Sequence, residues 1–387
     1  MGGRPQGDRK GHRQPVTDFV VIGGGFAGIS AAAHLAPHGS VVLLEMESSL
    51  AYHTSGRSAA MLVENYGSQG SRPLVKAARP FFEDPPSGAV DSPLLSPRPV
   101  LFVADSSGLA DLEIKAETGR ANGAHNEILD AEGVIEKMPA IRSDWVGGGL
   151  FEPSGADIDV AALHQAFVRI ARSNGAEIIT SAPVTAIQRS NDGWTVISGN
   201  RRLSSPVVVN AAGAWGDVLA RLADVEALGL QPYRRTAFMV PGSEQSSMWP
   251  MVVETHENWY LRPDGVQFLC SLAEEVASEP MDVRPRMEDV ALAIERINLA
   301  TTLDIRTVNS QWTGLRTFSP DRDLVIGEDP TAPGFFWLVG LGGIGVQTSP
   351  AYGALLASLV TDQGIPDPLR AAGVDPERTS PDRFRIS

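Results

Sequence analysis

The sequence predicts an α/β protein in which a domain built on a parallel sheet is interrupted twice by a second, largely antiparallel β domain. A short apolar strand at 18–22 runs into glycines and a helix of small residues, and a second buried strand follows at 41–44. This order is typical of a βαβ unit, whose parallel strands are covered on both faces. The strand-to-glycine pattern returns at 207–215 and 335–345. Between these two segments, residues 231–318 are predicted mainly as strands.

The chain has 387 residues, which is enough for two domains. The predicted segments are a disordered tail at 1–16, a Rossmann-like nucleotide-binding domain at 17–96, 151–228 and 319–365, a substrate-binding domain at 97–150 and 229–318, and a C-terminal tail at 366–387. Helices are expected at 27–36, up to 171, at 286–300 and at 349–360.

Composition argues against several classes of function. The net charge of −14 disfavours a nucleic-acid partner, because such binding needs clustered basic residues. Cys270 is the only cysteine, so we expect a buried strand residue and neither a disulfide nor a metal site. No apolar run approaches the roughly 18 residues that span a bilayer, and the opening stretch lacks the apolar core of a secretory signal. We therefore expect a cytoplasmic protein, with a peripheral position at the inner membrane face as the alternative.

A dinucleotide fingerprint follows the first strand. Gly23-x-Gly25-x-x-Gly28 opens the first helix, where glycines allow a tight turn and a close approach of a pyrophosphate to the helix N-terminus. Glu45 ends the next strand, at the spacing where an acid accepts hydrogen bonds from a ribose diol. Together these features predict dinucleotide binding.

A second glycine cluster distinguishes FAD from NAD. Gly340 to Gly345 precedes a helix near the other end of the chain. An NAD enzyme has no evident need for this cluster, whereas a second helix N-terminus stabilises the negative charge of a reduced flavin. The expected cofactor is therefore FAD.

Five motifs follow one another in a characteristic order. They are Val21-Ile22-Gly23-Gly24-Gly25-Phe26-Ala27-Gly28, Tyr52-His53-Thr54-Ser55-Gly56-Arg57-Ser58-Ala59-Ala60, Asn210-Ala211-Ala212-Gly213-Ala214-Trp215, Gly314-Leu315-Arg316 and the cluster from Gly340 to Gln347. In this order they resemble the glycine/D-amino-acid oxidase family of FAD-dependent oxidoreductases. Within that family the chain is most similar to bacterial FAD-dependent D-arginine dehydrogenases, from about Asp18 to about Leu359.

The resemblance implies FAD held without a covalent tether and a small amino-acid substrate. The implied cofactor-binding residues are Gly23, Gly25, Ala27, Gly28, Glu45, Met46, Thr54, Ser55, Gly56, Arg57, Ser58, Ala59, Ala60, Val184, Gly213, Gly342, Gly345, Val346 and Gln347. The implied catalytic residues are Tyr66, Tyr260, Arg316 and Gly343, the last accepting a hydrogen bond from the substrate amine through its backbone.

Residue chemistry agrees with this substrate class. An arginine fork holds a carboxylate best, and tyrosine hydroxyls donate further hydrogen bonds. Arg234 and Arg235 are adjacent, so in a strand one should face the pocket and the other solvent; we assign Arg235 to the pocket. The expected reaction is hydride transfer from the α-carbon to flavin N5, giving an imino acid that hydrolyses to a 2-oxo acid and ammonia.

The side-chain end of the pocket departs from the D-arginine dehydrogenases. In those enzymes a glutamate follows Leu-Ser-Pro-Arg-Pro and a histidine follows Ser-Ala-Ala; here the two positions are Val100 and Met61. Because a buried guanidinium without a partner is strongly disfavoured, we expect a D-amino acid with a neutral, apolar side chain. Glu64 or Glu254 could instead replace the missing carboxylate from another direction.

The lysine content bears on the oxidant. Relatives of the sarcosine-oxidase type place a lysine near the flavin, and this chain has no lysine after Lys137. We therefore expect a dehydrogenase that reduces a quinone-type acceptor rather than an oxidase. His53 is interpreted as structural rather than as a covalent flavin tether. D-arginine dehydrogenase proper, oxidation of a secondary amine or a 2-hydroxy acid, and a non-catalytic FAD-binding protein stay open as rival functions.

Overall fold

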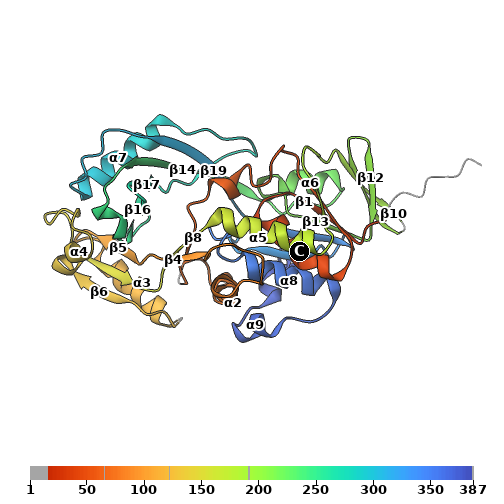
Figure 1. Cartoon of the computed structure of the whole chain (residues 1–387), viewed down its shortest axis with the longest axis horizontal. Coiled ribbons are helices and arrows are strands. Elements are labelled where there is room, and N and C mark those ends of the chain that lie inside the picture. The colour runs from red at the N-terminus through yellow and green to blue at the C-terminus, as the bar shows by residue number, and fades with distance from the viewer. Residues whose placement is uncertain (1–15, 65, 122, 191, 386–387) are drawn as a thin grey trace, which may run out of the picture.

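The computed structural model describes residues 16–64, 66–121, 123–190 and 192–385, and its two lobes lie side by side (Figure 1). The expected tail at 1–16 lies outside these residues apart from Val16, which forms a bridge with Ser204. Asn191, in an expected hairpin, also lies outside them, although the strands on either side of it pair with each other.

The first lobe is built on a mainly parallel sheet. Its strand order is β20-β21-β13-β1-β2-β9, and only β20 runs antiparallel to its neighbour. The bounds are β1 Phe19–Ile22, β2 Val41–Leu44, β9 Glu177–Ile179, β13 Val207–Asn210, β20 Val325–Glu328 and β21 Phe335–Val339. Strands β1, β2, β13 and β21 begin or end within two residues of the strands that the sequence predicts, because continuous apolar runs fit a sheet that is covered on both faces. Strand β20 was not predicted.

Side chains of each central strand alternate between two cores. In β1, Phe19 and Val21 pack in one core while Val20 and Ile22 pack in the other. The first core contains helices α1 Phe26–Leu35, α2 Arg72–Glu83, α5 Val160–Ser173 and α8 Ser349–Thr361. The second contains the meander β10 Ala186–Ser190, β11 Gly193–Ser198 and β12 Arg201–Ser205, with helix α6 Gly216–Leu222.

The second lobe is a large, mostly antiparallel sheet. Its order is β18-β14-β17-β16-β15-β5-β7-β6, with β19 on the free side of β14. The bounds are β5 Val100–Ala104, β6 Glu127–Asp130, β7 Gly148–Glu152, β14 Gln231–Pro241, β15 Met251–Glu254, β16 Tyr260–Asp264, β17 Gln267–Ser271, β18 Val276–Ala277 and β19 Ser310–Phe318. Helix α7 Met287–Ala300 covers one face, where Cys270 is fully buried. Helices α3 Leu109–Ala121 and α4 Ala131–Lys137 complete the lobe.

A small sheet lies where the chain passes between the lobes. Strands β3 Met61–Leu62, β8 Ala156–Ile158 and β4 Leu95–Pro97 form it, with β8 in the centre. On β8, Asp157 pairs with Arg98 at 2.9 Å and with Arg262 of β16 at 3.1 Å. This carboxylate therefore joins the small sheet to the second lobe.

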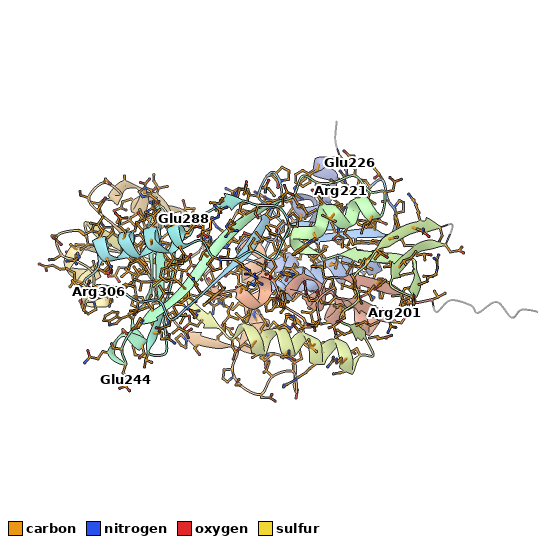
Figure 2. All side chains as sticks on the ribbon, turned by 90° about the horizontal axis from the view of Figure 1, so that it is seen from above. Arg201, Arg221, Glu226, Glu244, Glu288 and Arg306 are labelled. Atoms are coloured by element: carbon orange, nitrogen blue, oxygen red, sulfur yellow. The ribbon has the colours of Figure 1, made fainter. Side chains whose placement is uncertain are left out.

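Charged residues labelled in Figure 2, such as Arg306 and Glu244, lie at the periphery of the molecule.

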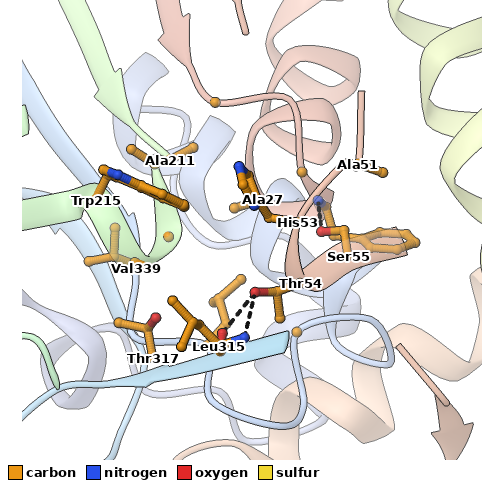
Figure 3. A pocket seen from close by; sticks show the side chains of 18 of the residues that line it. Ala27, Ala51, His53, Thr54, Ser55, Ala211, Trp215, Leu315, Thr317 and Val339 are labelled. Atoms are coloured by element: carbon orange, nitrogen blue, oxygen red, sulfur yellow. Dashed lines mark hydrogen bonds between the residues drawn. The ribbon is translucent and has the colours of Figure 1, made fainter. Parts of the chain in front are cut away.

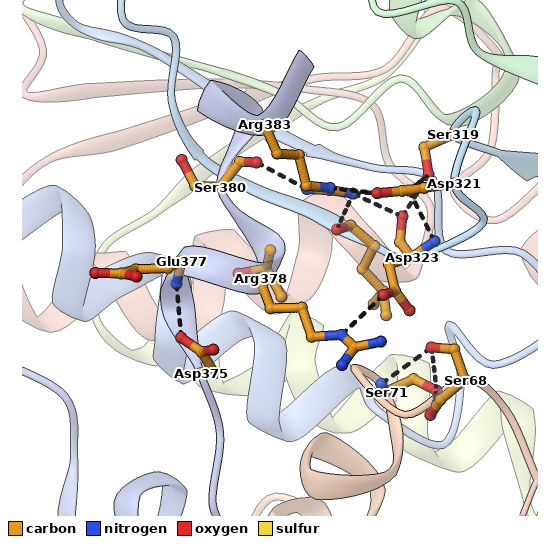
Figure 4. A network of polar contacts seen from close by, with 12 residues as sticks. Ser68, Ser71, Ser319, Asp321, Asp323, Asp375, Glu377, Arg378, Ser380 and Arg383 are labelled. Atoms are coloured by element: carbon orange, nitrogen blue, oxygen red, sulfur yellow. Dashed lines mark hydrogen bonds and ion pairs between the residues drawn. The ribbon is translucent and has the colours of Figure 1, made fainter. Parts of the chain in front are cut away.

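The expected C-terminal tail is part of the first lobe. Residues 366–385 form α9 Asp367–Ala371, α10 Pro376–Thr379 and a final turn, and Leu369 is buried in the first core. Arg378 pairs with Asp323 at 2.9 Å and Arg383 with Asp321 at 2.6 Å (Figure 4). The segment is ordered rather than a tail because these ion pairs attach it to the loop that follows β19.

Candidate functional site

A large cavity lies where the carboxyl ends of the parallel strands face the second lobe. It is lined by residues from segments within 22–27, 44–46, 51–59, 182–184, 211–222, 235–237, 314–317 and 338–346, together with Tyr260. Such a position, outside the carboxyl ends of parallel strands, is where open α/β sheets bind ligands. Figure 3 shows part of its wall.

The first glycine turn is shaped by close backbone contacts. A Cβ at Gly23, whose φ is +113°, would lie 2.4 Å from the carbonyl oxygen of Ala211. A Cβ at Gly28 would lie 1.8 Å from the carbonyl oxygen of Gly23, so helix and turn pack closely only because both residues are glycine. The N-cap residue of α1 is Gly25, which has no side chain to cap the helix, and Ser55 Oγ accepts from the N–H of Phe26 at 3.0 Å. The other N–H groups at the start of α1 are left for an anion in the cavity.

His164 supports this turn from behind, although it was not predicted as a site residue. Its Nε2 lies 3.1 Å from the carbonyl oxygen of Gly24, and its ring packs edge-on against Phe26. Burial lowers the pKa of His164, so the neutral form is favoured and donates to that carbonyl. A histidine on a helix 140 residues away gives no local signal for this role.

Glu45 lies at the end of β2, on the cavity wall. Its Oε2 accepts from the backbone N–H of Gly24 at 2.5 Å, and its Oε1 accepts from that of Glu47 at 2.8 Å. Each carboxylate oxygen retains a second acceptor position. The arrangement fits a carboxylate that receives ribose hydroxyls while also fixing the first glycine turn.

The loop at 54–60 is held from both lobes. The Thr54 hydroxyl donates to the carbonyl of Leu315 at 2.8 Å, and Ser55 Oγ accepts from the N–H of Phe26 at 3.0 Å (Figure 3). Arg57 donates to the carbonyl of Thr313 at 2.8 Å and pairs with Asp282. The loop therefore forms a fixed edge of the cavity at which the two lobes meet.

The second glycine turn touches the arginine of the expected substrate site. A Cβ at Gly343 would lie 2.8 Å from Cζ and Nη1 of Arg316, and a Cβ at Gly342 would lie 2.4 Å from the Phe318 ring. Glycine at these positions lets β19 lie against the turn. The Arg316 guanidinium consequently lies next to the segment expected at the flavin pyrimidine edge.

Arg316 and Arg235 face the same cavity from neighbouring strands. The register pairs Arg235 with Gly314 and Tyr233 with Arg316, so the two arginines are diagonal neighbours on one face of the sheet, about 7–8 Å apart at their backbones. Arg316 Nη1 donates to Tyr66 Oη at 3.4 Å. Among the described residues, this is the one hydrogen bond that the Arg316 guanidinium makes. Tyr260 lines the same space and is buried.

Arg234 does not reach solvent, contrary to expectation. It lies on the opposite face from Arg235 but is only 7% exposed, and it donates to the carbonyl of Arg284. The alternation of the strand is therefore as predicted, while the second face is covered by the loop at 281–286 rather than by water.

Met61 and Val100 lie behind the cavity wall rather than on it. Both are buried in an apolar cluster with Phe102, Ala237 and Tyr260, and the last two line the cavity.

Neither carboxylate considered as a replacement is free. Glu64 pairs with Arg79 at 2.5 Å, and Glu254 accepts from His256 Nδ1 at 3.0 Å and from two backbone N–H groups. Neither carboxylate is therefore an unpaired counterion for a cationic substrate side chain.

His53 lies in the cavity with its ring already occupied. Its Nε2 is 3.0 Å from Glu47 Oε1, and its ring centroid is 4.7 Å from that of Trp215 (Figure 3). The carboxylate and the indole account for the position of this ring, so a structural role remains our prediction.

Most of the predicted site residues line the cavity. Those that do are Gly23, Gly25, Ala27, Glu45, Met46, Thr54, Ser55, Arg57, Ser58, Ala59, Val184, Gly213, Arg235, Tyr260, Arg316, Gly342, Gly343, Gly345 and Val346. Those that lie outside its lining are Gly28, Gly56, Ala60, Met61, Tyr66, Val100 and Gln347.

One of the outer residues contacts a lining residue, and some lining residues were not predicted. Tyr66 accepts a hydrogen bond from the lining residue Arg316, whereas Gln347 accepts from the N–H of Val63, which is not part of the lining. Trp215 and the apolar end formed by Val218, Leu219 and Leu222 line the cavity but were not predicted as site residues.

The described part of the chain offers neither a metal site nor a membrane span. It contains no group of three or more His, Cys, Asp or Glu placed to hold a metal ion. No helix within the same residues has the length and apolar character needed to cross a membrane.

Comparison with known proteins identifies relatives over almost the whole chain. The model of the family described as DAO, FAD dependent oxidoreductase, matches residues 18–359. Human mitochondrial sarcosine dehydrogenase is 25% identical over 367 residues, which cover 88% of this chain but only 39% of that enzyme; the chain thus spans well under half of its length. N-methyl-L-tryptophan oxidase of Shigella flexneri is 24% identical over 89% of this chain and 95% of its own.

A solved structure shows the same fold. L-proline dehydrogenase from P. horikoshii superposes with a TM-score of 0.84 at 19% identity, over 96% of this chain and 98% of its own. The expected α/β flavoprotein fold is confirmed. The family is as predicted, whereas the closer resemblance to D-arginine dehydrogenases stays a prediction.

The cofactor is FAD, and the residues present fit it. The N-terminus of α1 and the glycines at 23–28 suit the pyrophosphate, Glu45 suits a ribose, and the apolar end near Val184 suits the adenine. The turn at 340–346 and the loop at 54–59 border the other end of the cavity, where the isoalloxazine would lie beside Arg316.

Proposed function

The chain belongs to the FAD dependent oxidoreductase (DAO) family, and we propose that it oxidises the α-carbon of a D-amino acid with a neutral side chain. The products are the 2-oxo acid and ammonia. The observation that carries the proposal is Arg316, a guanidinium that lies against Gly343 beside the expected flavin position and faces the cavity. Such a fork suits a carboxylate, and the preference for the D configuration rests on the resemblance in the sequence.

The residues of this chain bind and orient the substrate. Arg316 receives the carboxylate, with Arg235 beside it and the hydroxyls of Tyr66 and Tyr260 as further donors. The backbone carbonyl of Gly343 accepts from the substrate amine, which must be neutral when it reacts. FAD, when bound, supplies the acceptor for the α-hydrogen as hydride. Loss of hydride from the neutral amine leaves a protonated imine without removal of a proton, so no residue is assigned as a general base. The imino acid then takes up water and releases ammonia.

The apolar cluster behind Tyr260 and Ala237 supports a neutral substrate side chain. Met61 and Val100 belong to it, and the nearby carboxylates of Glu64 and Glu254 are paired with other residues. A cationic side chain would find no counterion there and would lose its hydration. D-arginine and D-lysine are therefore expected to be poor substrates.

We propose that the enzyme is a dehydrogenase with a quinone-type acceptor. No lysine lines the described part of the cavity, and relatives of the sarcosine-oxidase type use a lysine to activate oxygen. Stopped-flow reoxidation of the reduced enzyme by air should be slow compared with reoxidation by a soluble quinone. Rapid reoxidation by air would overturn this part of the proposal.

A secondary amine is the second candidate substrate. It is favoured by the names of the relatives, which include a sarcosine dehydrogenase and an N-methyl-L-tryptophan oxidase. Such a substrate has the same carboxylate for Arg316 and replaces one N–H by an alkyl group. The two candidates therefore share the clamp and differ only at the nitrogen.

Anaerobic bleaching of the flavin separates these candidates. The holoenzyme is mixed with D-leucine, D-methionine, D-phenylalanine, D-arginine, L-leucine, sarcosine, L-proline and a 2-hydroxy acid. Fastest bleaching by a neutral D-amino acid supports the first candidate, and fastest bleaching by sarcosine or proline supports the second. Bleaching by none of them would indicate a non-catalytic flavoprotein. D-arginine as the best substrate would refute the argument from Val100 and Met61.

A further inference from the structure

The strand beside Arg235 is interrupted at one place. Strands β17 and β18 both pair with β14, and the register joins Phe238 to Cys270 and Arg234 to Val276. Residues 235–237 of β14 therefore lie opposite the longer stretch 271–275. The extra residues form a bulge in which Ala273 has a φ of +58°. Bulges of this kind re-aim side chains next to active sites.

The bulge supplies acceptors to Arg235. The carbonyl of Glu274 accepts from Arg235 Nε at 3.0 Å, and its carboxylate accepts from the N–H of Thr236 at 2.5 Å, where a neighbouring strand would otherwise pair. Glu275 Oε1 lies 3.6 Å from Arg235 Nη2. One glutamate thus fixes the position of Arg235 through the backbone, and the next brings a carboxylate to its guanidinium.

Glu275 also has a second cation on the outer side. Both of its carboxylate oxygens accept from Arg322 Nη2, at 2.8 and 3.0 Å. The Arg322 guanidinium lies 3.9 Å above the Phe318 ring. Glu275 is therefore shared between a buried arginine of the pocket and an exposed arginine on the loop after β19.

This arrangement matters because two positively charged side chains face the pocket. Arg235 and Arg316 both line the cavity, and two neighbouring guanidinium groups without counterions would suit two carboxylates. Burial, followed by the charge of Arg316, lowers the pKa of Arg235. Burial raises the pKa of Glu274, so that carboxyl is disfavoured as the compensating anion. The carboxylate paired with the Arg235 guanidinium is that of Glu275, at 3.6 Å, and its side chain is 36% exposed.

We propose that Glu275 is the counterion of Arg235 and that it limits the pocket to one substrate carboxylate. This inference rests on the proposed function, because it assumes that Arg316 holds the carboxylate. Glu275 selects monocarboxylate amino acids against amino dicarboxylates, since a second carboxylate must displace it from Arg235.

Carboxylate binding to the holoenzyme tests this without turnover. Wild type, Glu275→Gln and Arg322→Gln are titrated with acetate and with malonate, followed by the visible flavin spectrum. Glu275→Gln should lower the Kd for malonate relative to acetate about tenfold, the effect of about 1.4 kcal/mol. Arg322→Gln should not lower the Kd for malonate relative to acetate, because Glu275 can then pair with Arg235 alone. D-aspartate turnover relative to D-alanine should rise in parallel in Glu275→Gln.

Different outcomes separate the inference from the proposed function. Glu275 could serve only to link the bulge at 271–275 to the loop after β19. Both variants should then change malonate and acetate binding alike, and the inference is overturned. A malonate-to-acetate ratio within a factor of two of wild type in Glu275→Gln also overturns it. Glu275→Ala repeats the test should the glutamine variant lose FAD. If Arg316→Met leaves acetate binding unchanged, the carboxylate clamp itself is wrong, whatever the ratio shows.

Discussion

The two walls of the FAD cavity are built from different kinds of contact. The wall on the first lobe consists of backbone turns, in which a Cβ at Gly23 or Gly28 would overlap a carbonyl oxygen. The wall on the second lobe consists of charged side chains, Arg235 and Arg316, whose positions depend on other side chains and on a strand bulge.

Because of this difference, mutations on the two walls should impair different functions, cofactor binding on one and substrate binding on the other. A change in the backbone wall alters the shape that receives the cofactor, whereas a change in the side-chain wall alters the charge that receives the substrate. Substitutions on the first wall should therefore lower FAD occupancy, and those on the second should spare it. Single substitutions on each wall, and one away from both, test that difference.

Glu45→Ala should cause the largest loss, on the first wall. The carboxylate is expected to accept two ribose hydrogen bonds, each worth about 1.5–3 kcal/mol because one partner is charged, and it also holds Gly24. The purified variant should contain little FAD, measured from the ratio of visible to ultraviolet absorbance. Glu45→Gln, which keeps the shape, should lose less. Full occupancy in Glu45→Ala would show that this strand end does not bind the ribose.

A separate experiment on the purified protein tests whether His53 is covalently bound to the flavin. Acid precipitation of wild type should leave a colourless pellet, because the FAD is expected to be untethered. A yellow pellet would indicate a covalent link and would explain any FAD retained by Glu45→Ala.

Arg316→Met should have the next largest effect, on the second wall. Loss of a charge-paired bidentate contact costs about 2–5 kcal/mol, roughly 30-fold to several-thousand-fold. The expected result is a steep fall in kcat/KM with FAD still bound. Arg306→Met, on an exposed arginine that pairs with Asp304, is the matched control and should behave as wild type. A fall of less than tenfold would remove Arg316 from the site.

Gly343→Ala tests the place where the two walls touch. The added Cβ would lie 2.8 Å from the Arg316 guanidinium, and accommodating it should cost about 1–3 kcal/mol. We expect both a raised KM and a weaker affinity for FAD. Gly314→Ala adds the same methyl group to the cavity wall on β19, but at 3.7 Å from its nearest neighbour, so it should leave the Arg316 guanidinium in place and raise KM less than Gly343→Ala does. Equal effects of the two substitutions would contradict the proposed contact.

His256→Gln should have the smallest effect, because it lies away from both walls. Hydrogen bonds to Asp111 and then Glu254 raise the pKa of His256. The stabilisation is therefore complete below the unfolded pKa, about 6.5, and is lost as the pH rises through the folded pKa. The residue is half exposed, so the contribution is at most about 1 kcal/mol. The Tm difference between wild type and variant should be clear at pH 5.5 and absent at pH 9, with FAD content unchanged at both.

The sequence was informative where local pattern and glycine geometry determine the structure. The strands at 19–22, 41–44 and 335–339 and the turns that follow them were predictable, since apolar runs that end in glycines have few other solutions. The bulge at 271–275 was not predictable, because Glu274 within it bonds to Arg235 and Thr236, which lie 39 and 38 residues earlier in the chain. The C-terminal segment was mistaken for a tail for a related reason: its ion pairs are with Asp321, Asp323 and Asp329, about 55 residues or more earlier in the chain.

The discontinuity of the first lobe has a consequence for synthesis. Its central sheet takes β1 and β2 from the start of the chain, β13 from the middle and β21 from residues 335–339, and the cavity is closed by the turn at 340–346. The ribosome makes a chain from its N-terminus, and domains generally fold as units in that order. Here the first lobe begins before the second lobe but is completed after it, since β21, α8 and the segment at 366–385 follow the second lobe in the chain. The cofactor site is therefore complete only after the turn at 340–346 has been made, and a chain truncated before residue 340 lacks an FAD site however well its second lobe has folded.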